Sequence, residues 1–175
     1  VFGVRSDRLR SQASGKELTV DRLLTPDWVN VVAIADEGDG PFLLCVRQYR
    51  FGTRAMSLEI PAGLVDPGEP ARDAALRELR EETGRKPVRV WAVPSVNLYY
   101  RWQIDTVLLI PAFAAELDAD PILDDEHDAF GWFRLDEALG KLHWPEQKRL
   151  VQVVHGFLLA PIPYDLLIPL ADSAA

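Results

Sequence analysis

Four glutamates between residues 63 and 85 form the clearest chemical pattern in this sequence. Glu78, Glu81 and Glu82 stand at positions i, i+3 and i+4, so on a helix their side chains share one face. Three like charges on one face repel one another unless a cation lies among them. Carboxylate oxygens are the ligands that Mg²⁺ and Mn²⁺ prefer, together with water and substrate phosphates. The spacing therefore predicts a divalent-metal site.

A solvated acidic helix face is the alternative interpretation of such a charge run. The flanking residues argue against it. Glu69 lies at the start of the predicted helix, and Arg77 can orient the carboxylates. Gly63 follows a predicted strand, in a loop where the backbone must approach its neighbours closely. These residues favour a built site over an ordinary solvated surface.

The helix that must position the glutamates has recognisable ends. The Pro-Gly pair at residues 67–68 indicates a turn, and Pro70 suits the first turn of a helix. Gly84 suits the position just after the last helical residue. The sequence therefore predicts a helix over residues 71–83, which carries the three clustered carboxylates.

Apolar segments on both sides of this helix predict a mixed sheet. Residues 29–35 form a strand that ends in a turn-rich segment, and residues 42–48 are its expected hairpin partner. Residues 104–115 form a long apolar run, so we expect a central strand there. Further strands are predicted over residues 17–23, 57–60, 88–93 and 130–133, and further helices over residues 135–142 and 146–159. This order predicts an α/β fold in which helices flank a mixed sheet.

The composition excludes several classes of protein. The 175 residues carry a net charge of −8, and such a surface repels nucleic acid and anionic membranes. No apolar run reaches the roughly 18 residues of a membrane helix, and the polar residues 1–15 lack the apolar segment of a signal peptide. The single cysteine, Cys45, lies in a predicted buried strand, so no intrachain disulfide forms and we expect a cytoplasmic protein.

The stretch from Gly63 to Arg85 resembles the Nudix box, whose pattern is G-x5-E-x7-R-E-U-x-E-E-x-G-U with U apolar. Every fixed position matches, and a chance match has a probability on the order of 10⁻⁸ per start position. The last apolar position is Arg85, a departure that concerns local packing rather than chemistry. The resemblance implies an α/β/α sandwich over residues 17–160, between a polar segment (1–16) and a tail (161–175).

The resemblance also implies the role of each residue in the box. Glu78 and Glu82 would bind Mg²⁺ or Mn²⁺ directly, and Glu81 would be a further ligand or would polarise the attacking water. The carbonyl of Ala62 would complete the metal shell, and Arg77 would hold the glutamates in place. The implied chemistry is metal-assisted attack of water on phosphorus in a nucleoside diphosphate derivative, with no nucleic acid or membrane as partner.

Residues upstream of the box indicate which branch of the family the chain resembles. Residues 47–50 (Arg-Gln-Tyr-Arg) and 57–63 (Ser-Leu-Glu-Ile-Pro-Ala-Gly) resemble the ADP-ribose and nucleotide-sugar pyrophosphatases. Arg50 is then a candidate to bind phosphate, and a surface arginine at a strand end is the alternative. Glu59 could lie near the metals. The preferred substrate is ADP-ribose or another nucleoside diphosphate sugar.

An acidic cluster at residues 124–128 supplies a second group of candidates. In the family, a loop at this place supplies a carboxylate that activates water or binds another metal, and Glu126 is our choice for it. An ordinary acidic loop is the alternative. We interpret His127 as a surface loop residue, because magnesium-type sites prefer oxygen ligands.

Two features point to other branches. The ADP-ribose group has a proline about sixteen residues beyond the box, whereas this chain has tyrosines there, which resembles the dinucleoside polyphosphate branch. Residues 126–133 with 144–147 resemble the dihydroneopterin triphosphate pyrophosphatases. Tyr100, with Tyr99 and Trp102, could stack on a base or could form core or dimer contacts. A triphosphate substrate and a non-catalytic nucleotide-binding module are the alternatives, and we expect a homodimer.

Overall fold

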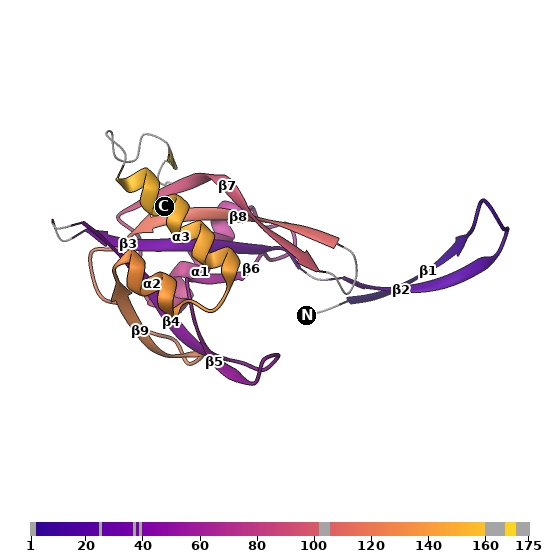
Figure 1. The fold of residues 1–175 in the computed structure, drawn as a ribbon, viewed down its shortest axis with the longest axis horizontal. Helices are drawn as coiled ribbons and strands as arrows, with labels where there is room; N and C mark the ends of the chain where they lie inside the picture. Colours follow the sequence, from indigo (N-terminus) through magenta and orange to yellow (C-terminus); the bar gives the residue numbers. More distant parts are fainter. Residues whose placement is uncertain are drawn as a thin grey trace.

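The computed structural model describes residues 3–24, 26–36, 38, 40–101, 106–159 and 167–170. The strands are β1 (Gly3–Arg10), β2 (Glu17–Leu24), β3 (Trp28–Asp36), β4 (Pro41–Arg50), β5 (Ala55–Glu59), β6 (Ala62–Leu64), β7 (Arg89–Arg101), β8 (Thr106–Glu116), β9 (His127–Phe133) and β10 (Ile168–Pro169). The helices are α1 (Ala71–Thr83), α2 (Leu135–Lys141) and α3 (Pro145–Leu158). Figure 1 labels these elements along the chain, apart from β10.

One mixed sheet organises the domain. Its strand order is β10-β7-β8-β3-β4-β5, with β6 paired to β3 and β9 paired to β4. The pairing of β3 with β8 is parallel, whereas the other pairings within this sheet are antiparallel. The strand over residues 104–115 was predicted to be central, and β8 does lie between two neighbours. The predicted hairpin of β3 and β4 is also confirmed.

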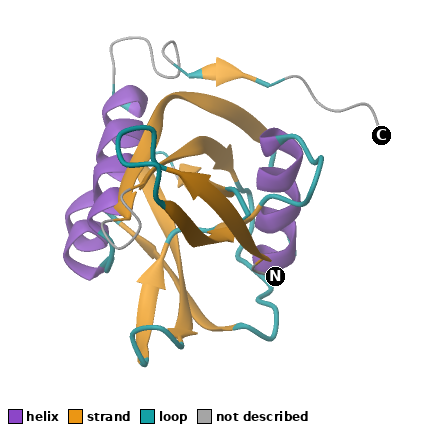
Figure 2. Ribbon diagram, turned by 90° about the vertical axis from the view of Figure 1, so that its right-hand side faces the viewer, coloured by secondary structure: helices purple, strands orange, loops and turns teal. Residues whose placement is uncertain are grey.

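Two hydrophobic cores cover the two faces of this sheet. Side chains alternate along a strand, so Val31 of β3 belongs to one core and Val32 to the other. The first core packs against the apolar stripe of α1, which includes Leu79. The second packs against α2 and α3, through residues such as Ala138 and Leu150. Figure 2 shows helices on both sides of the strands, which confirms the predicted α/β/α sandwich.

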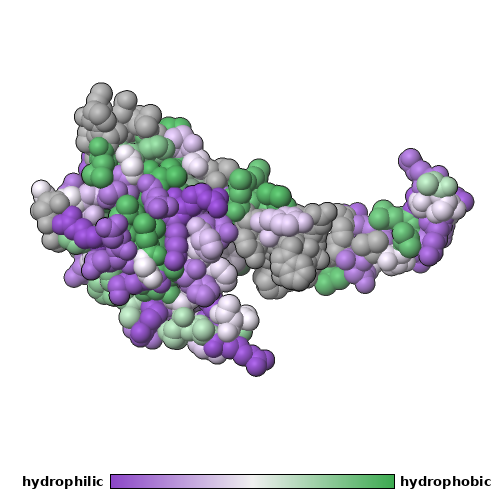
Figure 3. All heavy atoms as spheres, in the orientation of Figure 1, coloured by the Kyte–Doolittle hydropathy of each residue, from purple (hydrophilic) through white to green (hydrophobic). Residues whose placement is uncertain are grey.

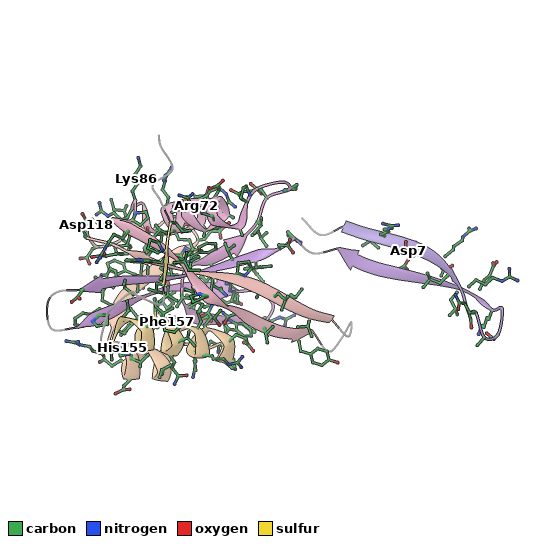
Figure 4. The ribbon with its side chains drawn as sticks, turned by 90° about the horizontal axis from the view of Figure 1, so that it is seen from above. Asp7, Arg72, Lys86, Asp118, His155 and Phe157 are labelled. Atoms are coloured by element: carbon green, nitrogen blue, oxygen red, sulfur yellow. The ribbon has the colours of Figure 1, made fainter. Side chains whose placement is uncertain are left out.

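The helices lie where the sequence predicts them. The predicted and observed bounds of α1 are the same, and its C-terminal cap is Gly84 at a φ of 61°. This left-handed conformation lets the Gly84 backbone N–H donate to the carbonyl of Arg80, 2.8 Å away. Figure 4 shows Arg72, on α1, and His155 and Phe157, on α3, on opposite sides of the sheet. None of the helices in the described residues is long and apolar enough to span a membrane.

The N-terminal residues form an arm that the sequence analysis did not predict. A strand was predicted over residues 17–23 but none before it, whereas β1 pairs with β2 along its whole length, from Gly3 opposite Leu24 to Arg10 opposite Glu17. Figure 1 and Figure 3 show this hairpin projecting away from the rest of the molecule. The sequence of β1 is mostly polar and charged, with no regular apolar alternation, so no apolar pattern marked it as a strand.

Short strands were also missed. The segment β6 has three residues, and β10 has two, which is too short for a periodic signal. The strand predicted over residues 88–93 continues as β7 to Arg101, past a register shift between Ala92 and Val96. The predicted domain boundaries at residues 17 and 160 stay a prediction.

Candidate active site

A cavity of about 410 Å³ opens where α1, β6 and the end of β4 meet the loop before β9. It brings together the box glutamates and the acidic cluster, which lie about 45 residues apart in the chain. The lining residues are Trp28, Gln48, Arg50, Ala62, Gly63, Leu64, Asp66, Arg77, Glu78, Glu81, Glu82, Asp124, Glu126 and His127.

Arg77 donates hydrogen bonds to several residues in the wall of this cavity. Its Nε and Nη2 atoms donate to the carboxylate of Glu69 at 3.0 and 2.9 Å. Its Nη1 atom donates to Glu78 at 2.8 Å and to Glu81 at 3.1 Å, and Nη2 also donates to the carbonyl of Leu64 at 2.7 Å. The bonds from Arg77 lower the pKa of Glu69. This geometry matches the holding role that the box resemblance implies for Arg77.

Glu78 lies directly over the backbone of Gly63. A Cβ atom at residue 63 would stand 2.0 Å from the Glu78 carboxyl group, so only glycine leaves space for the carboxylate. Burial raises the pKa of Glu78, although the hydrogen bond and charge of Arg77 oppose this effect. The glycine therefore serves to seat a carboxylate in the cavity wall.

Glu82 is the most buried carboxylate of the box. Its side chain is 7% exposed, and Oε1 accepts a hydrogen bond from the backbone N–H of Ala62 at 3.4 Å. Its Oε2 atom is buried, and the described residues offer it no hydrogen-bond partner. Burial raises the pKa of Glu82 well above its ordinary value, and the nearby charges of Glu78 and Asp124 add to this effect. A buried carboxylate oxygen without a donor suits a cation ligand.

These residues fit a divalent metal. Glu78, Glu82 and Ala62 line one cavity, and Glu82 offers an oxygen that no donor in the described residues satisfies. Within those residues, no three Asp, Glu, His or Cys side chains converge as a complete ligand set. Mg²⁺ keeps several waters and takes only one or two carboxylates from a protein, so a partial set suits it.

Arg50 and Glu59 form an ion pair at the 410 Å³ cavity, which is named the metal cavity for the fit of its residues to a divalent cation. Arg50 donates through Nε and Nη2 to the two carboxylate oxygens at 2.8 and 2.7 Å. Glu59 is 2% exposed, so burial raises the pKa of its carboxyl group, but the bonds and charge of Arg50 outweigh that and the net pKa is lowered. Gln147 also donates to Glu59, at 3.4 Å. Arg50 lines the cavity, but one edge of its guanidinium is already bound.

A second cavity, of about 480 Å³ and mostly apolar, adjoins the first. The two share Trp28, Arg50 and Ala62. Its other lining residues are Asn30, Gly52, Thr53, Glu59, Leu108, Ile110, Trp144, Glu146 and Gln147. The sequence analysis did not select Trp28 or Leu108, because each looks like an ordinary strand residue until β3 and β8 are placed side by side.

The remaining predicted site residues lie at different distances from this centre. Glu81 and Glu126 are exposed residues in the lining of the metal cavity. Tyr100 is exposed on β7 and is not among the residues that line either cavity, so its role in stacking stays a prediction. Trp102 lies outside the described residues.

The sequence interpretation of His127 as a surface loop residue is wrong. His127 is the first residue of β9, is 6% exposed and lines the metal cavity. The sequence carried no sign of this burial, because the neighbours Glu126 and Asp128 are polar and exposed.

Arg85, the departure from the box pattern, does not pack as an apolar residue would. Instead, its Nε atom donates to the carbonyl of Asp120 at 2.7 Å.

Comparison with known proteins finds several relatives of this chain. Over 102 residues the chain is 35% identical to a rat bis(5'-nucleosyl)-tetraphosphatase, covering 56% of this chain and 69% of that protein. It is 39% identical over 71 residues to an ADP-ribose pyrophosphatase of Bacillus subtilis, covering 41% of this chain and 37% of the relative. It also matches 28% of the length of an uncharacterized Nudix hydrolase of Schizosaccharomyces pombe, at 50% identity over 58 residues.

The fold has close counterparts among solved structures. A Caenorhabditis elegans Ap4A hydrolase in a binary complex superimposes with a TM-score of 0.62 at 21% identity, covering 77% of this chain and 98% of that one. The model of the NUDIX domain family matches residues 26–154, which includes both cavities and all three helices except the end of α3. The chain therefore belongs to the Nudix family.

Proposed function

We propose that this enzyme cleaves the pyrophosphate linkage of ADP-ribose or of another nucleoside diphosphate sugar, with Mg²⁺ or Mn²⁺ as cofactor. The observation that carries the proposal is the junction of the two cavities at Trp28, Arg50 and Ala62. The carboxylate-lined cavity suits a metal-bound diphosphate, and the adjoining apolar one suits a nucleoside. A volume of about 480 Å³ lies within the usual range for small-molecule sites.

The charges in the metal cavity favour a short phosphate chain. Among its lining residues, six are acidic and only Arg50 and Arg77 are cationic. Both arginines are already hydrogen-bonded to glutamates. A diphosphate between two organic groups carries less charge than a triphosphate or a longer chain, so one or two metal ions could neutralise it without further basic residues. The relative from Bacillus subtilis, an ADP-ribose pyrophosphatase, supports the same substrate class.

Each residue of the site would have a separate role in the reaction. A divalent metal bound by Glu78, Glu82 and the carbonyl of Ala62 would neutralise phosphate charge and acidify a water molecule. Arg77 keeps Glu78 and Glu81 in position. Glu81 accepts a hydrogen bond from Arg77, so one of its carboxylate oxygens is already engaged. We therefore assign acceptance of the proton from the attacking water to Glu126.

The products follow from the bond that breaks. Water forms a new P–O bond at one phosphorus atom, and the bond from that phosphorus to the bridging oxygen breaks. The bridging oxygen leaves with the second phosphate. ADP-ribose then gives AMP and ribose 5-phosphate, with one water consumed. The free edge of the Arg50 guanidinium is positioned to bind a phosphate oxygen of the substrate.

A dinucleoside polyphosphate is the second candidate. The observation in its favour is the rat relative, a bis(5'-nucleosyl)-tetraphosphatase of which this chain covers 69%. A direct test compares kcat/KM for ADP-ribose, a second nucleotide sugar, diadenosine tetraphosphate, dATP and dihydroneopterin triphosphate, and identifies the products. We expect ADP-ribose or the second sugar to be preferred, with AMP released from ADP-ribose. A preference of about 100-fold for another substrate, or release of pyrophosphate, would overturn this assignment.

We also propose that the enzyme is a homodimer whose contacts include the β1–β2 arm. An isolated two-stranded hairpin is marginally stable in water, and this one exposes Val4, Leu9 and Leu18. Residues 1–24 contain five basic and three acidic residues, which gives this segment a net charge of +2. Because the whole chain has a net charge of −8, the remaining residues carry −10. A basic arm and an acidic body are complementary surfaces, which favours a second copy of this chain as the partner.

A further inference from the structure

His127 presents a bare nitrogen to the metal cavity. Its side chain is 2% exposed, and its Nδ1 atom lies 2.7 Å from Oδ1 of Asp124. The same oxygen accepts the backbone N–H groups of Glu126 and His127, each at 3.1 Å. An ionised carboxylate can only accept hydrogen bonds, so Asp124 places the ring hydrogen on Nδ1. The Nε2 atom then carries a lone pair, and the described residues give it no hydrogen-bond partner.

The unpartnered nitrogen faces an unpartnered oxygen. Nε2 of His127 lies 4.0 Å from Oε2 of Glu82, and both atoms are buried. Two lone pairs that face each other in a buried space are unfavourable unless something positive lies between them. Two metal–ligand bonds of ~2.1 Å together span about 4.2 Å, so one cation could contact both atoms.

The strand geometry aims His127 at this place. The pairing of β4 with β9 shifts register between Arg47 and Gln48, which is where His127 enters the ladder. Such a bulge turns a strand and redirects its side chains, and bulges are common beside active sites. The carboxylate of Asp124 behind the ring completes the arrangement by which proteins orient metal-binding histidines.

We infer that His127 is a metal ligand, through Nε2, at the divalent-metal site that contains Glu82. This inference rests on the proposed metal role of the cavity. It has a consequence for metal choice, because imidazole nitrogen is a ligand of first-row transition metals, a series in which Mn²⁺ binds most weakly but to which Mg²⁺ does not belong. The Glu82–His127 pair therefore makes the site favour Mn²⁺ over Mg²⁺ more strongly than an all-oxygen set would.

Pulsed electron paramagnetic resonance of the Mn²⁺-loaded full chain tests this inference directly. A nitrogen bound to Mn²⁺ gives a strong ¹⁴N modulation, which changes to a ¹⁵N pattern when the histidines are labelled. We expect this signal in the wild type. We expect it to disappear in His127→Gln and to persist in His155→Gln, a control that changes a histidine on α3 outside both cavities.

Competition of Mg²⁺ against bound Mn²⁺ gives a second readout that does not depend on activity. We expect the preference for Mn²⁺ to fall about 10-fold or more in His127→Gln. Mn²⁺ bound without a coordinated nitrogen in the wild type would overturn the role of His127 but leave the proposed function standing. Failure of the wild type to bind Mn²⁺ at all would overturn both. The wild-type spectrum decides the question even if the variant does not fold.

Discussion

The carboxylate of Glu78 occupies the space that a side chain at residue 63 would need, with its carboxyl carbon 2.0 Å from the position of a Cβ on Gly63. Glu78 belongs to α1 and Gly63 to β6, so the helix and the short strand meet at this contact. The glycine of the box is therefore explained by sterics rather than by backbone conformation, since its φ is not in the left-handed region.

Substitution of Gly63 by alanine should displace Glu78 and lower kcat/KM about 100-fold, because small misplacements of catalytic groups have large effects on rate. Gly140→Ala is the matched control, since a Cβ at residue 140 meets nothing within 4 Å. The control lies inside α2, so it should keep full activity and unfold at a slightly higher temperature. Equal activity of both variants would refute the steric explanation.

Glu82→Gln should nearly abolish turnover and stabilise the metal-free protein. The substitution removes a buried charge with little change in volume, so packing is kept while the metal loses a ligand. Because burial raises the pKa of Glu82, the charged form is unfavourable in the folded protein at neutral pH. We expect the metal-free variant to gain about 1 kcal/mol in free energy of unfolding. Kinetics and thermal unfolding monitored by circular dichroism check both parts, and a folded variant with near wild-type rate would remove Glu82 from the metal site.

Mg²⁺ or Mn²⁺ should raise the melting temperature, and an excess of chelator should abolish activity. The clustered glutamates repel one another without metal, and a ligand that binds only the folded state stabilises it by about 2.7 kcal/mol at 100 times its Kd. Differential scanning calorimetry measures the shift, with NaCl at equal ionic strength as the control. Full activity in excess chelator would contradict the proposed chemistry.

Glu59→Gln should destabilise the protein by about 2 kcal/mol at neutral pH, because it leaves the half-buried cation of Arg50 without its partner. The pKa of Glu59 is lowered from its ordinary value of 4.5. Its ionised form therefore stabilises the folded state fully above about pH 4.5, and this contribution is lost as the pH falls through the lower folded-state pKa. Urea unfolding from pH 7 to pH 3 should show the difference between wild type and variant shrinking in acid. A difference that is constant with pH would exclude the ion pair as its cause.

The double variant Leu9→Thr/Leu18→Thr should shift the proposed dimer towards monomer. Leu9 and Leu18 are direct cross-strand partners in the arm, and a Thr–Thr pair keeps β-propensity while removing apolar surface. Val88→Thr is the control, because Val88 is exposed but lies outside the arm. Sedimentation velocity over a concentration series measures the association. If the wild type is monomeric, or if the control dissociates as readily as the double variant, the arm is not the dimer contact.

The sequence by itself determined the parts of this protein that depend on neighbours a few residues apart. The three glutamates share a face because a helix repeats every 3.6 residues, and α1 ends at Gly84 because glycine adopts a left-handed conformation without a steric penalty. The strands β3, β4 and β8 were predictable from local apolar runs. The resemblance to the Nudix box could also be read from the sequence, because the motif is one continuous stretch that runs from Gly63 in β6 to Arg85 just beyond α1.

Only the tertiary structure decided which distant residues share the site. Glu59 and Gln147 are 88 residues apart, and their contact requires α3 to pack on the correct face of the sheet. His127 enters the metal cavity because β9 pairs with β4 through a shifted register, and nothing in residues 124–128 encodes that shift. Strand order, register and the side on which each helix packs depend on how the two cores are filled, so burial at such positions follows from the whole chain rather than from local pattern.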